Sequence, residues 1–268
     1  MHNARIVIDS DSPRISFGTT GSESWPQWDR YLLIDGEQVY HVGNICGTCD
    51  FFFEKRPHAS EIGSDELSAP QIADRLRSST DVMNPAFLKR LGSILEPGEY
   101  EVIHRLVRPV LTFPGDERDY FSNECIDLFA EYEGEAPHSP KTSYYRCKDF
   151  AMSDTVRFFD FLIPLQEPAT LDSQRVSEYE QVLRGGTIPT AFSVSLLDIK
   201  APALKASPAP VSEHWCLANY VLDGHHKIYA ASRQNLSVSV LSFLSARASL
   251  ANAECVSAAV SALDQSAA

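Results

Sequence analysis

Apolar residues in the first half of this chain fall mostly in short runs typical of β-strands. We predict strands at residues 5–8, 29–42, 99–113 and 143–147, and short amphipathic helices at residues 68–77 and 85–95. Asp35-Gly36 splits residues 29–42 into two β-rich runs, the signature of a type I′ hairpin. Pro109 is expected to break residues 99–113 into two strands or to lie at a sheet edge.

The second half alternates strand-like and helix-like patterns. We predict a strand and loop at 156–168, a helix at 172–184, a strand at 187–199, a Pro/Ala-rich loop at 200–211 and a strand at 214–222. In the predicted helix, Val176, Tyr179 and Leu183 share one face, and Gly185-Gly186 ends it. The final residues, 246–268, form an Ala/Ser-rich tail that we interpret as a docking helix.

A polar cluster, Asp223-Gly224-His225-His226-Lys227, separates the strand at 214–222 from a short helix that Asn235 ends. A further strand, LSVSVLSFL, follows. The first amides of a helix have no intrahelical partner, so this strand–turn–helix–strand order favours a bound phosphate. The two histidines and the lysine would add donors, while Asp223 would cap the helix or help to hold a metal. The alternative is a solvated turn with an aspartate cap.

This cluster and the order of its neighbours resemble the ParB/sulfiredoxin-like fold, whose Asp-Gly-His-His-Arg turn binds nucleotide phosphates. The resemblance covers about residues 155–243. It implies a ParB/sulfiredoxin-like nucleotide-binding module at 151–245. Residues 1–150 resemble no family and read as a β-rich domain, so with the tail at 246–268 we predict an α+β protein. The family's arginine is Lys227 here, which keeps the charge but loses the bidentate fork.

Two branches of this fold fit poorly. Sulfiredoxins carry a reactive cysteine where this chain has His225, so their thiol nucleophile is missing. The ParB branch places a helix-turn-helix after its phosphate-binding turn. Here only the Ala/Ser-rich tail at 246–268 follows the last strand, and a formal net charge of −13 opposes DNA binding. We therefore expect no nucleic-acid partner.

A third branch, the ADP-dependent free serine kinases, has an acidic residue after its first strand, and Glu167 is the nearest equivalent here. The resemblance implies a phosphotransferase for a small hydroxyl-bearing metabolite, with ATP or ADP and Mg²⁺ as cofactors. Glu167 and His226 would be catalytic, and Asp223, Gly224, His225, His226 and Lys227 would bind the nucleotide. The alternative is an accessory or regulatory protein that binds a nucleotide or phosphometabolite without turnover.

The composition is that of an ordinary globular protein, with 44% hydrophobic and 22% charged residues. No apolar run is long enough to span a bilayer and no secretion signal opens the chain, so we expect a cytosolic protein without a membrane partner, its six cysteines reduced. Cys46 and Cys49 form a C-x-x-C pair with three interpretations: half of a zinc site, a redox dithiol or a buried turn. Further zinc ligands would come from afar, at His41, His58, His104, Cys125, His138 or Cys147.

Overall fold

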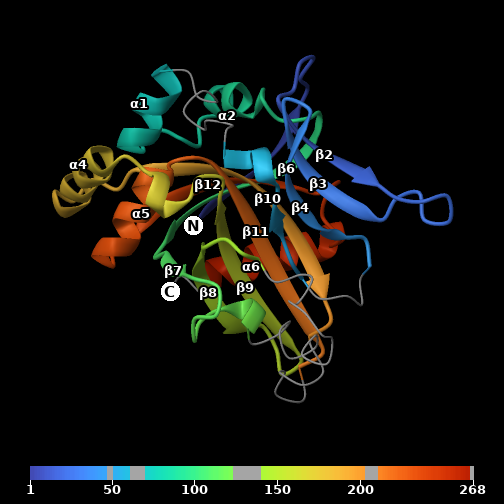
Figure 1. The fold of residues 1–268 in the computed structure, drawn as a ribbon. Coiled ribbons are helices and arrows are strands. Elements are labelled where there is room, and N and C mark those ends of the chain that lie inside the picture. Colours follow the sequence, from blue (N-terminus) through green and yellow to red (C-terminus); the bar gives the residue numbers. More distant parts are fainter. Residues whose placement is uncertain (47–50, 61–69, 123–139, 203–210, 266–268) are drawn as a thin grey trace.

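The computed structural model describes residues 1–46, 51–60, 70–122, 140–202 and 211–265, and it confirms the α+β class (Figure 1). The strands are β1 (His2–Ile8), β2 (Ile15–Thr20), β3 (Asp29–Ile34), β4 (Glu37–Asn44), β5 (Glu54–Lys55), β6 (Gly98–Val107), β7 (Val110–Thr112), β8 (Tyr144–Ala151), β9 (Val156–Pro164), β10 (Thr190–Lys200), β11 (Glu213–Asp223) and β12 (Val238–Ser245). The helices are α1 (Pro70–Ser78), α2 (Pro85–Gly92), α4 (Ser173–Arg184), α5 (His225–Gln234) and α6 (Ala253–Gln265).

The structure confirms several predictions that rest on short sequence signals. Asp35 and Gly36 take left-handed φ values of 51° and 85°, as a type I′ turn between β3 and β4 requires. The strand break falls at Pro109, between β6 and β7, and the tail forms α6. Helix α2 ends three residues earlier than predicted, because the backbone of Ile94 and Glu96 hydrogen-bonds to Ile15 instead.

Two sheets organise the chain. The larger has the strand order β1-β6-β12-β10-β11-β9-β8-β7, and the smaller is β2-β3-β4-β5. Strands β10 and β12 are parallel neighbours, as are β9 and β11, while β6 pairs antiparallel with β12. The predicted domain boundary at residue 150 therefore runs through one continuous sheet, to which both halves of the chain contribute strands.

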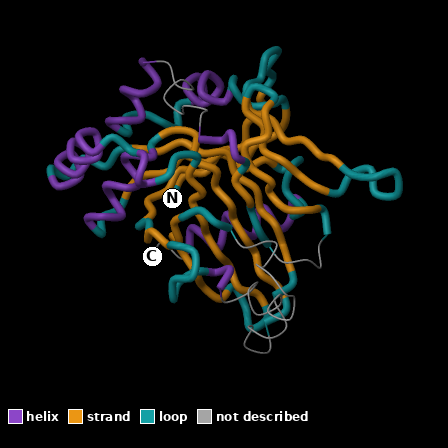
Figure 2. The backbone as a smooth tube through the Cα atoms, viewed as in Figure 1, coloured by secondary structure: helices purple, strands orange, loops and turns teal. Residues whose placement is uncertain are grey.

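The large sheet is rolled (Figure 2). Strands β6 and β9 are four positions apart, which in a flat sheet means about 19 Å at the usual strand spacing. Yet Arg105 of β6 forms a two-pronged ion pair with Asp160 of β9, with Nη2 2.8 Å from Oδ1. The sheet must curl to bring these side chains together. Strand β7, which continues β6 along the chain, accordingly pairs with β8 at the opposite end of the strand order.

The inner face of this roll carries two apolar clusters separated by polar residues. On β11, Leu217 packs in the cluster that includes Val256 of α6, and Val221 packs in the cluster of α4 and α5. Asn219 lies between them on the same face. Its amide donates to Asp160, 3.0 Å away, and its oxygen accepts from Ser195 and Ser242. Five strands thus share one buried polar band.

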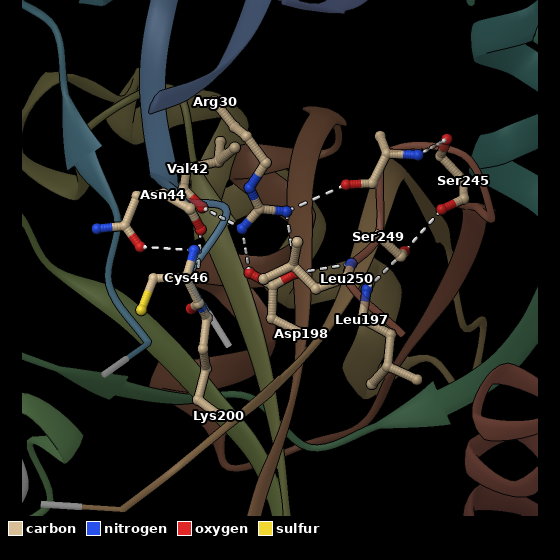
Figure 3. A network of polar contacts seen from close by, with 11 residues as sticks. Arg30, Val42, Asn44, Cys46, Leu197, Asp198, Lys200, Ser245, Ser249 and Leu250 are labelled. Atoms are coloured by element: carbon tan, nitrogen blue, oxygen red, sulfur yellow. Dashed lines mark hydrogen bonds and ion pairs between the residues drawn. The ribbon is translucent and has the colours of Figure 1, made fainter. Parts of the chain in front are cut away.

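The small sheet packs on the other face and is fastened to it by a buried network (Figure 3). Arg30 of β3 pairs with Asp198 of β10 and donates to the carbonyls of Val42 and Ala248. Lys200 donates to the carbonyls of Asn44 and Cys46, at 3.3 and 2.6 Å. These charge-assisted bonds hold the start of β3 and the end of β4 against the large sheet.

Several expected features lie outside the described residues: most of the loop at 200–211 and the candidate zinc ligands Cys125 and His138. In the described part of the chain, no helix combines the length and the apolar character needed to cross a bilayer.

His214 of β11 provides a pH test of the packing around Tyr120 on the large sheet. Its Nδ1 lies 3.0 Å from the hydroxyl of Tyr120, beside the ring of Phe159. Burial, with a smaller contribution from Arg157, lowers the pKa of His214 from its usual value of 6.5 to about 4. The unfolded chain therefore binds a proton more readily than the folded one, and stability is lost as the pH falls from 6.5 towards 4.

Acidification from pH 7 to pH 4 should lower the free energy of unfolding of both proteins. We expect the loss to be about 2–3 kcal/mol larger in the wild type than in the His214→Gln variant. Urea unfolding of both proteins across this range measures the difference. Parallel pH profiles for the two would show that His214 does not carry the effect.

Candidate functional site

The strand–turn–helix–strand unit predicted around residue 224 is present as β11, α5 and β12. Gly224 caps α5 with a left-handed φ of 99°. A Cβ added there would lie 2.7 Å from Cβ and 2.9 Å from Cα of Ala191 on β10. Glycine is therefore required both by the conformation and by the close approach to the neighbouring strand.

Helix α5 presents its amino-terminal end at this turn. Its first intrahelical hydrogen bond runs from the amide of Ile228 to the carbonyl of Gly224, at 2.9 Å. The amides of residues 225–227 precede that bond and point out of the helix end, as in any α-helix. The helix stops at Asn235, whose left-handed φ of 52° matches the predicted stop.

The two histidines of the turn act differently from what the sequence predicts. Nε2 of His225 accepts the backbone N–H of Leu165 at 3.0 Å, and Nε2 of His226 accepts that of Asp172 at 3.2 Å. A ring nitrogen that accepts a hydrogen bond carries no proton, so neither Nε2 can donate to a phosphate. Both buried rings instead hold the loop between β9 and α4 against the turn.

Lys227 and Asp223 form a close pair. The lysine is 3% exposed, and its Nζ donates to Oδ1 of Asp223 and to the carbonyl of Thr190, both at 2.9 Å. The Tyr179 ring of α4 lies 5.9 Å away. Asp223 makes no side-chain cap to the helix, so of its two predicted roles the capping role is wrong.

A cavity of about 160 Å³ opens at the helix end, lined by Ala73, Arg175, Tyr179, Asp223, Gly224, His226 and Lys227. Pockets for drug-sized ligands usually measure about 300–1,000 Å³, so this one suits a single anionic group and not a whole nucleotide. Arg175, which the sequence analysis missed, comes from the first turn of α4, four residues before Tyr179 on the same helix face. Ala73 comes from α1, which lies near α4 in Figure 1.

The structure places Glu167 away from the lining of this cavity. Its Oε1 pairs with Nζ of Lys55 at 3.2 Å, and its Oε2 accepts from the hydroxyl of Ser143 at 3.1 Å. Lys55 belongs to β5, so this carboxylate ties the loop after β9 to the small sheet. The loop that carries Glu167, residues 165–172, nevertheless contacts the turn, because His225 and His226 hold its two ends.

The predicted zinc pair is only partly visible. Cys46 is in a disulfide, so the expectation that all six cysteines are reduced is wrong. Its sulfur is therefore not the thiolate that zinc binding requires, and Cys49 lies outside the described residues. Among the described residues there is no group of three or more histidine, cysteine or acidic side chains placed to hold a metal ion.

No protein-family model, curated protein or solved structure matches this chain.

Proposed function

We propose that this protein binds the phosphate group of a nucleotide or phosphorylated metabolite at the amino-terminal end of α5. The observation that carries this proposal is the meeting of the helix end, Arg175 and Lys227 on one small cavity. Backbone amides and the helix dipole favour an anion at such a position.

The charges around the cavity also favour an anion. Two cations, Arg175 and Lys227, face one carboxylate, Asp223, which already pairs with Lys227. Lys227 is held too rigidly to swing outward, so it acts as a fixed positive charge, whereas the exposed Arg175 supplies a forked donor. The lining of the cavity is therefore locally positive, although the whole chain has a net charge of −13.

Binding without turnover is the version that the geometry supports best, because both oxygens of Glu167 are engaged by Lys55 and Ser143. A phosphotransferase using ATP or ADP with Mg²⁺ is the second candidate. It is supported by the loop 165–172, which His225 and His226 hold next to the phosphate pocket. In that version Glu167 would exchange Lys55 for the acceptor hydroxyl.

Calorimetric titration with pyrophosphate, ADP and ATP, each with and without Mg²⁺, tests the proposal. We expect Arg175→Gln to weaken binding about tenfold, as loss of one charge-assisted contact does. Arg184→Gln is the matched control, since Arg184 lies at the other end of α4, outside the cavity lining, and should bind as the wild type does.

Thermal unfolding supplies a second readout, because a ligand at about 100 times its Kd adds about 2.7 kcal/mol to the folded state. If none of these phosphates binds, or if both arginine variants bind as the wild type does, the proposal is wrong. Phosphoryl transfer by the wild type separates the two candidates. If the protein is an enzyme, Glu167→Gln should abolish that transfer and leave the phosphate affinity unchanged; if it only binds, neither protein transfers phosphate and both bind alike.

A further inference from the structure

A second cavity, of about 430 Å³, lies in the loop that joins β2 and β3. Its lining is Thr20, Gly21, Ser22, Trp25, Trp28 and Asp29. The loop projects from the body of the molecule (Figure 1), and Trp25 is 62% exposed. A volume in this range is typical of small-molecule sites.

The indole rings form a corner. Their centroids are 5.3 Å apart with an interplanar angle of 64°, an edge-to-face arrangement and not one flat platform, and both residues line the cavity. Asp29 completes the lining with a carboxylate. Indole faces and a carboxylate are the groups that recognise organic cations, with tryptophan the strongest aromatic partner.

This corner is held in place before any ligand arrives. The amide of Trp28 donates to the carbonyl of Thr20 at 2.9 Å, and that of Ser22 donates to Trp25 at 2.9 Å. A Cβ on Gly21 would lie 1.8 Å from the carbonyl oxygen of Trp25, so only glycine allows this packing. Where the loop enters β3, Arg30 forms an ion pair with Asp198 of the large sheet (Figure 3). Such pre-organisation lowers the entropy cost of binding.

The local charge is negative. Residues 15–29 contain Glu23 and Asp29 and no lysine or arginine. His41 contacts Oδ1 of Asp29 at 3.1 Å, and burial lowers the pKa of His41, so the imidazole is neutral at pH 7 and leaves the carboxylate its charge. Oδ2 of Asp29 makes no hydrogen bond or ion pair with any described residue.

We propose that this cavity binds an organic cation of the alkylammonium class, seated in the corner against the Trp25 and Trp28 rings with its charge towards Asp29. This site is independent of the phosphate pocket, which is built from α4, α5 and β11. The proposal therefore stands or falls separately from the proposed function.

Choline is the probe, and 3,3-dimethyl-1-butanol is its uncharged isostere. The chain has three tryptophans, and the third, Trp215, is buried with its indole N–H donating to Glu213, so it serves as an internal control. In ¹H–¹⁵N spectra we expect choline to shift the indole signals of Trp25 and Trp28 and to leave that of Trp215 in place. The isostere should shift none of them.

Asp29→Asn keeps the shape of the carboxylate and should weaken choline binding about tenfold. Trp25→Leu should abolish the shift of Trp28, whereas Phe113→Leu, at an exposed aromatic ring elsewhere, should change nothing. An unmoved Trp215 signal shows that each variant is folded. The proposal is overturned if choline shifts no indole signal, if the isostere acts equally, or if Asp29→Asn binds choline as the wild type does.

Discussion

Replacing Asp160 with asparagine is expected to lower the free energy of unfolding by about 3–5 kcal/mol, because it leaves the buried Arg105 guanidinium without its counter-charge. Asp160 is fully buried and accepts from Arg105 and Asn219. This pair also closes the roll of the large sheet, so we expect its loss to loosen the pairing around β6 and β9. Urea unfolding measures the first effect and amide exchange in those strands measures the second.

Arg14→Gln is the matched control for this experiment. It removes one member of the Arg14–Asp35 pair, whose side chains are 35% and 50% exposed. Surface pairs contribute about 0–1 kcal/mol, so we expect little change. The double variant Arg105→Met/Asp160→Leu, which removes both charges, should recover part of the lost stability. If Asp160→Asn costs no more than Arg14→Gln, the ion pair does not hold the rolled sheet.

Replacing Gly224 with alanine is expected to cost about 2–4 kcal/mol, the sum of left-handed strain and overpacking. The new methyl group would meet Ala191, and relief of that contact would move the start of α5 away from β10. Because the amides of residues 225–227 would move with it, we expect phosphate affinity to fall as well. Chemical unfolding and calorimetric titration report the two losses.

Gly186 separates the two causes. It also has a positive φ, of 85°, but an added Cβ there would meet nothing within 4 Å. Gly186→Ala should therefore show the strain alone, about 1–2 kcal/mol, and should leave phosphate binding intact. Adding Ala191→Gly to Gly224→Ala removes one of the two close contacts and should recover part of the difference. Equal costs at Gly186 and Gly224 would contradict the packing explanation.

Sequence reasoning succeeded where the signal was local. Asp35-Gly36, Pro109 and Asn235 each act through their own backbone preferences, and the structure shows the turn, the break and the helix stop that they predict. The unit around Gly224 was also foreseeable, because an apolar strand, a glycine and a short helical run follow one another directly.

What the sequence could not show depends on partners that are distant along the chain. Arg105 and Asp160 are 55 residues apart, and only the roll of the sheet joins them. Arg175 reaches the phosphate pocket because α4 packs beside α5, and Glu167 is engaged because β5 brings Lys55 to it. The histidines show the same limit: their residue type suggested donors, but burial against loop 165–172 made them acceptors.

A ¹H–¹⁵N titration with pyrophosphate tests the central claim most directly, since each backbone amide reports its own contact with the anion. We predict that the largest shifts fall on Gly224 and residues 225–227, with smaller shifts near Arg175. The rival position for the anion is a cavity of about 400 Å³ between α1 and α2, whose lining includes Arg75, Asn84 and Arg90. Shifts confined to that cavity, or no shifts at all, would contradict phosphate binding at the start of α5.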